Sequence, residues 1–276
     1  MKLGNKQSTS FRVAMILLAL VLLVVAVIVA IGQGSVPVGF RNAWESLLFR
    51  NQDKTTEAIV HNLRLPRILI AVFVGMALAA SGCILQAVVR NPMADPGIIG
   101  ISSGASFVTI LIMMVLPQLT SFIPLFSFCG AMLACLIINT LAYTNGEIMP
   151  TRLVLSGVAV NAIFGAGTSI ISVLNSEKLG SVLMWLNGSL VGRSWEDARL
   201  IIPYAAVGIL LSFLAIPTAN VLQLGDDTAK SLGINLLKSR LLLIALAAYL
   251  AGITVSFVGI IGFVGLVIPR ISRMLV

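Results

Sequence analysis

The chain alternates between long uncharged, apolar runs and short segments that hold its charged residues. An unpaired charge at the middle of a bilayer is costly, so each uncharged run marks a candidate membrane span. A spanning helix needs about 20 consecutive apolar residues. The pattern therefore predicts an all-α, polytopic transmembrane helical bundle. The uncharged runs cover residues 13–40, 68–89, 96–146, 153–176, 179–192, 200–225 and 241–269.

Prolines and glycines divide these runs into about eight spans. Pro117 and Pro124 split the longest run into two helices around a short turn, because proline interrupts helical hydrogen bonding. Three glycines between residues 259 and 265 break the last run. Residues 179–192 are too short to cross and, with two nearby tryptophans, predict an interfacial helix and loop. The predicted spans are residues 12–31, 65–88, 97–116, 123–143, 152–174, 199–217, 239–257 and 260–276.

Composition supports the membrane assignment and sets its orientation. The 276 residues are 58% hydrophobic and 10% charged, with a mean hydropathy of +1.06, whereas about a quarter of the residues in soluble domains are charged. The net charge of +8 is dispersed between the apolar segments, with no basic stripe that could follow a nucleic acid backbone. Lys2, Lys6 and Arg12 precede the first uncharged run and predict a cytoplasmic N-terminus in the cell (plasma or inner) membrane.

Few side chains in this sequence could support bond chemistry. His61 is the only histidine, and Cys83, Cys129 and Cys135 lie in apolar segments without metal-ligand spacing. The chain contains no P-loop motif, so we expect no nucleotide site of its own. No acidic residue lies deep in a predicted span, which disfavours an ion-coupled carrier. The sequence predicts that the chain is not an enzyme and has neither a metal nor a cofactor.

The segment from Asn91 to Gly104 is the first candidate site. Two prolines four residues apart, followed by glycines, force a turn with free backbone groups. At membrane depth such a turn needs a cover of protein or a water-filled cavity, so it is either an ordinary loop or the lining of a permeation route. The Gly100–Gly104 spacing favours helix packing over a nucleophile elbow, which needs a strand and a triad histidine. The candidate translocation-path residues are Asn91, Pro92, Asp95, Pro96, Gly100, Ser102, Ser103 and Gly104.

Two arginines stand at the predicted outer start of the second span. Arg64 and Arg67 are three residues apart and would face the same side of a helix, with Pro66 in its first turn. They either anchor the helix end at the membrane interface or dock carboxylates of an extracellular partner.

The linker over residues 219–235 is the third candidate. Asp226 and Asp227 after Gly225 favour a helix start, Lys230 suits its end, and Gly233 its stop. We expect a capped helix of about two turns on the inner side, either a connector or a docking element, with Leu222, Leu224, Ala229 and Leu232 as apolar contacts. The candidate coupling residues are Leu224, Gly225, Asp226, Asp227, Ala229, Lys230, Leu232 and Gly233.

Residues 64–107, which begin RLPRILIAVFVGMALAASG and include RNPMADPG, closely resemble the signature of the FecCD/BtuC-like permeases of ABC importers. These importers carry iron-siderophores, haem and vitamin B12. Residues 153–164, 222–235 and 259–276 agree with later parts of the same signature, in order. The resemblance therefore covers nearly the whole chain.

This resemblance implies a permease subunit that moves a ferric-siderophore, of ferrichrome type, or a related metal chelate by alternating access. It implies a dimer with a second permease copy or paralogue, two cytoplasmic ATPase subunits that hold ATP and Mg, and an extracytoplasmic substrate-binding protein. It also implies that residues 219–235 form a coupling helix against the ATPase, that Arg64 and Arg67 meet the binding protein, and that residues 91–104 flank the translocation path.

The sequence departs from the family pattern in two ways. Arg270 follows Pro269 at a position where the family usually has histidine. The family fold has ten helices, so residues 1–276 are predicted to form a single permease domain that lacks the last two. The alternative function is a secondary carrier driven by an ion gradient.

Overall fold

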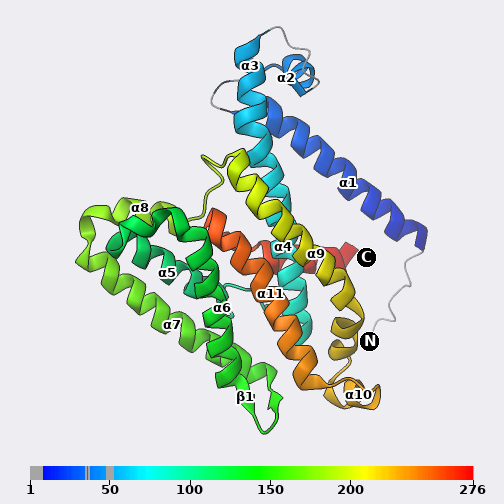
Figure 1. The fold of residues 1–276 in the computed structure, drawn as a ribbon. Helices are drawn as coiled ribbons and strands as arrows, with labels where there is room; N and C mark the ends of the chain where they lie inside the picture. Colours follow the sequence, from blue (N-terminus) through cyan, green and yellow to red (C-terminus); the bar gives the residue numbers. More distant parts are fainter. Residues whose placement is uncertain (1–8, 35, 37, 48–52, 276) are drawn as a thin grey trace. The chain divides into compact units, whose positions relative to one another are not determined.

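The computed structural model describes residues 9–34, 36, 38–47 and 53–275, and these fold into helices and one short β-hairpin (Figure 1). Lys2 and Lys6, which carry the predicted orientation, lie outside the described residues. The prediction of a helical bundle is confirmed. The helices are α1 Thr9–Gly32, α2 Phe40–Leu47, α3 Lys54–Ala58, α4 Leu65–Val89, α5 Ile101–Val115, α6 Ile123–Ala142, α7 Pro150–Leu174, α8 Leu179–Leu186, α9 Trp195–Gln223, α10 Asp226–Ser231, α11 Leu236–Val258 and α12 Val264–Leu275, and the strands are β1 Tyr143–Thr144 and β2 Glu147–Ile148.

Six of the described helices are long and apolar enough to cross a membrane. The two other predicted spans correspond to α5, with 15 residues, and α12, with 12, both shorter than the about 20 residues of a span. The predicted span starts at residue 97, but helix α5 begins at Ile101. The preceding Gly100 has a φ of 93°, which is outside the helical region of the backbone. The six long helices are Ser10–Gly32, Lys54–Val89, Pro117–Ala142, Pro150–Leu174, Trp195–Gln223 and Leu236–Val258.

The chain divides into two compact units. The first comprises Met1–Val72, Val191–Arg199 and Arg270–Val276. Within it, a π-helical turn, η1 (Ile59–Arg64), leads without a break from α3 into α4. A small apolar cluster of Ile31, Val38 and Val60 closes the turn after α1. The indole Nε1 of Trp195 donates to the backbone oxygen of His61 at 2.8 Å.

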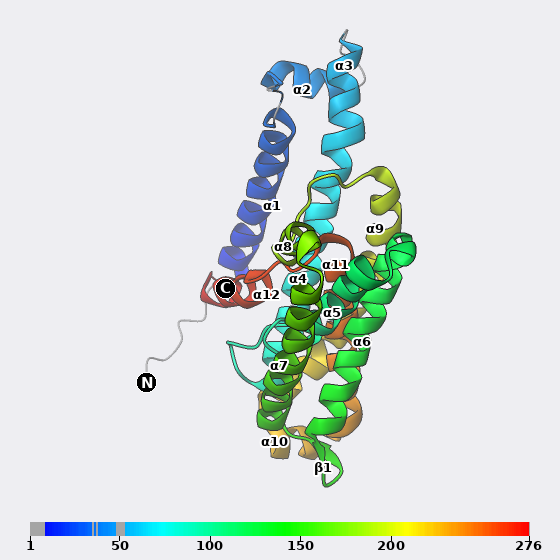
Figure 2. The ribbon, with the colours of Figure 1, turned by 90° about the vertical axis from the view of Figure 1, so that its left-hand side faces the viewer.

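The second unit comprises Phe73–Leu190 and Leu200–Pro269 and contains the main core. Helix α11 lies at its centre, with 72% of its most apolar stretch buried, and packs beside α5 and α6 (Figures 1 and 2). The β1–β2 hairpin and α10 lie at one end of this unit, and α8 lies at the other end of α7. Linker and hairpin are therefore neighbours, although about 80 residues separate them.

Small residues let the helices of this unit approach closely. A Cβ atom on Gly104 of α5 would lie 2.4 Å from the backbone oxygen of Gly130 of α6, closer than any real contact. In a bilayer, van der Waals packing of this kind is a main source of helix association. The predicted use of Gly104 in helix packing is confirmed.

Candidate functional site

The linker between α9 and α11 is a short helix bounded by two glycines. Gly225 has φ 109° and ψ 161°, a conformation that only glycine adopts readily, and Gly233 has φ 78°. Helix α10, between them, has six residues, against about seven for two turns. The predicted short helix is confirmed, but no side chain caps its start.

One carboxylate at the start of α10 joins three parts of the second unit. Asp226 Oδ1 accepts a hydrogen bond from Arg240 Nη2 at 2.6 Å and pairs with Arg90 Nη2 at 3.1 Å. Arg240, in the first turns of α11, is 1% exposed and also donates from Nη1 to the backbone oxygen of Ile148 at 2.8 Å. A buried guanidinium needs such partners, since its charge has lost its hydration. Asp226 therefore links α10 to the end of α4 and to α11, and Arg240 extends this link to the hairpin.

A second ion pair joins α10 to the hairpin from the solvent side. Lys230 Nζ lies 2.7 Å from Glu147 Oε1 of β2. The hydrogen bond and charge of Glu147 raise the pKa of Lys230 above its ordinary value. Both side chains are partly exposed, so this link is weaker than the buried one.

The apolar residues of the linker divide into two groups. Leu222 and Ala229 are buried in the core. Leu224 is 63% exposed and Leu232 58% exposed, so their predicted role as apolar contacts of a docking element stays a prediction. Ala229 is the buried residue of α10, and both leucines lie just beyond the two ends of this helix. Both are apolar side chains available to a partner on either side of the helix.

The turn after α4 is held by its own side chains and by α12. Asp95 Oδ1 accepts from the backbone N–H of Gly97 at 2.8 Å, and Asn91 Oδ1 accepts from that of Met93 at 2.9 Å. Burial raises the pKa of Asp95, with the Gly97 hydrogen bond opposing it. Gly265 of α12 lies so close that a Cβ there would be 3.0 Å from Asp95 Oδ2. The turn is therefore packed against protein.

Helix α7 covers the other side of this turn. Asn161 Nδ2 donates to the backbone oxygens of Gly97 and Ile98, at 3.0 Å each. A Cβ on Gly157 would lie 2.6 Å from the backbone oxygen of Ile99. These contacts satisfy backbone groups that the prolines and glycines of the turn leave free.

The predicted path residues differ in exposure. Asn91 and Pro92 are exposed, and Asp95 and Ser103 are half-buried. The buried members are Pro96, Gly100, Ser102 and Gly104. Most of the segment is thus packed between helices, and its place on a permeation route stays a prediction.

The two arginines at the start of α4 have different surroundings. Arg64 is buried, and its guanidinium donates to the backbone oxygen of Ile31 in the last turn of α1 and to that of Val36 in the turn that follows. Arg67 is exposed. Only Arg67 is therefore exposed to a partner, and the docking role of the pair stays a prediction. The carbonyls of the last turn of α1 and of the turn after it lack helical partners, and the guanidinium of Arg64 supplies donors to them.

Sequence reasoning missed Arg90, Glu147 and Asn161 as parts of these sites. Asn161 could have been noticed as an amide in the middle of the apolar run 153–176. Arg90 and Glu147 stand in ordinary connecting segments and carry no signal of their own. Over the residues that the structure describes, no group of three or more His, Cys, Asp or Glu side chains could hold a metal ion.

Six described helices that are long and apolar enough to cross a membrane are typical of a multi-pass membrane protein. The chain belongs to the FecCD transport family, whose family model matches residues 22–276. It is 36% identical to the Fe(3+)-citrate import system permease protein YfmE of Bacillus subtilis (strain 168), over 100% of this chain and 82% of that protein. It is 38% identical to the hemin transport system permease protein HmuU of Yersinia pestis, over 92% of this chain and 77% of that protein.

The fold agrees with this assignment. A solved structure of a metal-chelate type ABC transporter, in an inward-facing conformation, matches with a TM-score of 0.78 and 30% sequence identity. The match covers 95% of this chain and 81% of that chain. The predicted helical permease fold is confirmed, and the chain is a multi-pass protein of the cell membrane. Members of the family are transport permeases, which are not themselves enzymes.

Proposed function

We propose that this chain is the transmembrane permease subunit of an ATP-binding-cassette importer that carries a ferric-siderophore or a related metal chelate. Membership in the FecCD transport family supports this function, as do the relatives named for ferric citrate and hemin import. The sequence has no P-loop motif, so ATP would be hydrolysed by a partner. The observation that carries the proposal is the linker helix α10, tied by Asp226 to the membrane helices.

The assembly would contain a second permease copy or paralogue, two cytoplasmic ATPase subunits and an extracytoplasmic substrate-binding protein. The N-terminus would lie in the cytoplasm, which puts α10 and the β1–β2 hairpin on the cytoplasmic side. The exposed Leu224 and Leu232 would contact the ATPase there. The exposed Arg67 would face the binding protein on the extracytoplasmic side of the membrane. The buried Arg64 would hold the start of α4 in position.

Coupling would proceed through the contacts of α10. Two ion pairs hold this helix to α11 and to the hairpin between α6 and α7, so displacement of α10 would be transmitted to all three helices. Arg90 extends the connection to α4 and the turn at residues 91–104. Movement of packed helices between two arrangements is the usual basis of alternating access.

Reconstitution with partners tests the proposed function. The chain is co-expressed with its ATPase and binding protein, placed in proteoliposomes, and supplied with a radioactive ferric chelate. Uptake is expected to require ATP on the side of the membrane where the ATPase subunits lie. It should continue when a protonophore dissipates the proton gradient. Uptake that stops with the protonophore while ATP is maintained would favour the alternative, an ion-gradient-driven secondary carrier.

Mutation of the linker tests the coupling assignment separately. Gly225→Trp, or deletion of residues 226–230, should abolish uptake while the protein still inserts in the membrane. Gly192→Trp is the matched control, because Gly192 also has a positive φ, of 76°, with open space around it. Uptake at the wild-type rate in Gly225→Trp would remove α10 from the coupling mechanism.

A further inference from the structure

A groove of about 620 Å³ lies between α6 and α11, next to the β1–β2 hairpin. Its volume is within the range of about 300–1,000 Å³ that is usual for small-molecule sites. All of its lining belongs to the second compact unit. The lining residues are Met132, Cys135, Leu136, Asn139, Thr140, Tyr143, Ile148, Leu237, Leu241, Leu242 and Ala245.

One polar side chain in this groove has an unused acceptor. Asn139 is 9% exposed, and its Nδ2 donates to the backbone oxygen of Cys135 at 2.8 Å. Its Oδ1 is buried and has no hydrogen-bond partner among the described residues. Buried carbonyl groups are nearly always paired, so a ligand with an O–H or N–H donor would complete this site.

The rest of the groove is apolar and open to the surroundings of the helices. Leu136 is 63% exposed and Leu242 71% exposed, both on helices long and apolar enough to cross a membrane. Leucines at such positions pack against acyl chains where no other helix covers them. The ligand that reaches this groove most directly is therefore a lipid.

A positive charge stands on α11 beside the lining of the groove, at the residue that follows Leu237. Lys238 is exposed in the first turn of α11 and shares a helix face with Leu241, Leu242 and Ala245, at spacings of three, four and seven residues. Tyr143, at the end of α6, is 52% exposed on the other side. A basic residue and a tyrosine at the end of apolar helices are typical of contacts with an anionic lipid head group.

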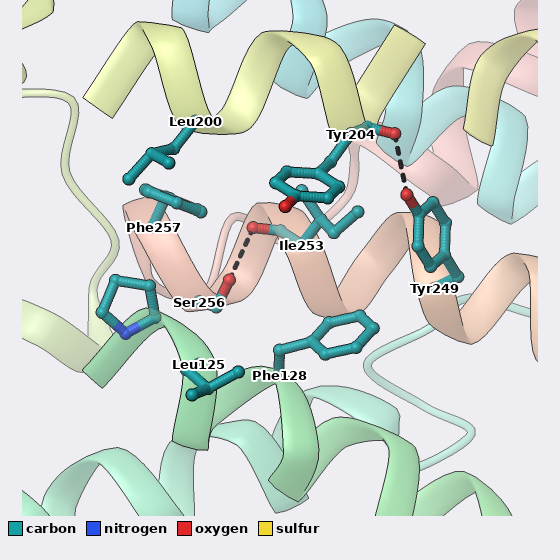
Figure 3. Close-up of a pocket in the computed structure, with 9 residues that line it drawn as sticks. Leu125, Phe128, Leu200, Tyr204, Tyr249, Ile253, Ser256 and Phe257 are labelled. Atoms are coloured by element: carbon teal, nitrogen blue, oxygen red, sulfur yellow. Dashed lines mark hydrogen bonds between the residues drawn. The ribbon is translucent and has the colours of Figure 1, made fainter. Parts of the chain in front are cut away.

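A second cavity in the same unit lacks these features. It has a volume of about 310 Å³, between α6, α9 and α11 (Figure 3). Tyr249 Oη donates to the backbone oxygen of Tyr204 at 3.1 Å, and Ser256 Oγ donates to that of Ile253 at 2.9 Å. None of its lining residues has a buried side-chain polar atom left unpaired in the described structure. The groove at Asn139 differs from this cavity because it has a buried acceptor without a hydrogen-bond partner in the described structure.

We propose that the groove binds an anionic membrane lipid with a hydroxyl-bearing head group, of the phosphatidylglycerol class. An acyl chain would lie along Leu136 and Leu242, the phosphate would pair with Lys238, and a hydroxyl would donate to Asn139 Oδ1. The site adjoins Ile148, whose backbone oxygen accepts from Arg240, so the lipid would stand next to the ion pairs of α10. The lipid assignment does not depend on which substrate the protein transports.

Lipid retention by the purified full chain tests the proposal. The protein is delipidated, exchanged into nanodiscs of phosphatidylglycerol, phosphatidylcholine or phosphatidylmethanol, and re-extracted, and retained lipid is counted by native mass spectrometry. Phosphatidylmethanol is anionic but has no head-group hydroxyl. We expect phosphatidylglycerol to be retained about tenfold over phosphatidylcholine and roughly fivefold over phosphatidylmethanol, the factor for one hydrogen bond. Equal retention of all three lipids would overturn the proposal.

Variants localise the effect to the groove. Asn139→Leu should remove the preference for phosphatidylglycerol over phosphatidylmethanol, and Lys238→Gln the preference for both anionic lipids. Ala245→Phe fills the groove without touching either polar group and should reduce retention of all lipids, which keeps the test valid if Asn139→Leu fails to fold. Arg199→Gln, at an exposed basic residue of α9, is the matched control and should retain lipid as the wild type does. Unchanged retention in Lys238→Gln and Ala245→Phe would place the bound lipid elsewhere.

Discussion

Arg240 Nη2 donates to Asp226 Oδ1 at 2.6 Å and so joins the first turns of α11 to the start of α10. The arginine is 1% exposed and the carboxylate 28% exposed, so the pair connects the protein interior to the linker surface. Because a buried cation without a counter-charge is strongly unfavourable, this pair fixes where α10 begins.

Replacement of this carboxylate should destabilise the protein. Asp226→Asn keeps the shape and one acceptor but leaves Arg240 and Arg90 without their shared charge, at an expected cost of about 1.5–3 kcal/mol in the free energy of unfolding. Denaturant unfolding in detergent measures the change. Asp227→Asn, at the exposed neighbour, is the control and should stay within about 0.5 kcal/mol of wild type. Equal effects of the two substitutions would show that the buried pair has no special role.

The two arginines at the start of α4 should separate stability from partner binding. Arg64→Ala removes the donors to the last turn of α1 and to the turn after it and is expected to lower stability by about 1.5–3 kcal/mol, while Arg67→Ala should change it by under about 0.5 kcal/mol. Thermal unfolding measures both. Arg67→Glu should in turn weaken the stimulation of ATPase activity by the loaded binding protein. Stimulation unchanged in Arg67→Glu would assign that residue to interface anchoring instead.

Asp95 predicts a pH dependence of stability. Burial raises its folded-state pKa above 3.8, so the folded state holds the proton more tightly than the unfolded state. The contribution of Asp95 is therefore most favourable below 3.8 and is lost as pH rises through the folded pKa. Asp95→Asn keeps the acceptor for Gly97 and removes this titration. The stability difference, variant minus wild type, should increase with pH and then level off in unfolding measured from pH 3.5 to 8, and a difference independent of pH would contradict the assignment.

The contact between α5 and α6 should tolerate no added methyl group. Gly104→Ala puts a Cβ 2.4 Å from the backbone oxygen of Gly130, so the helices must separate, at an expected cost of about 1–3 kcal/mol. Gly165→Ala, on α7 with open space around it, is the matched control and should be neutral or slightly stabilising. Guanidinium unfolding of both variants measures the contrast. Two equally stable variants would mean that the close approach contributes nothing.

The sequence could predict the helices but not which polar groups meet. Charge-free runs located all the long helices because the bilayer penalises charge at each residue separately. Gly225 and Gly233 marked the ends of α10 because their effect on the backbone is local. The partner of Asp226, by contrast, depends on how α10 folds back on α11, and Arg64 depends on carbonyls some 30 residues earlier. Asn161 reaches carbonyls over 60 residues away, a pairing that only the packed bundle determines.

The two links of α10 differ in their access to ions. Glu147 and Lys230 lie in contact with solvent, where the Debye length at physiological ionic strength is about 8 Å, so added salt screens their attraction. Arg240 is shielded from that screening by burial. At high ionic strength the far end of α10 would loosen first, while its first residue stays fixed. The linker would then swing about Asp226, which makes this one carboxylate the pivot of the segment.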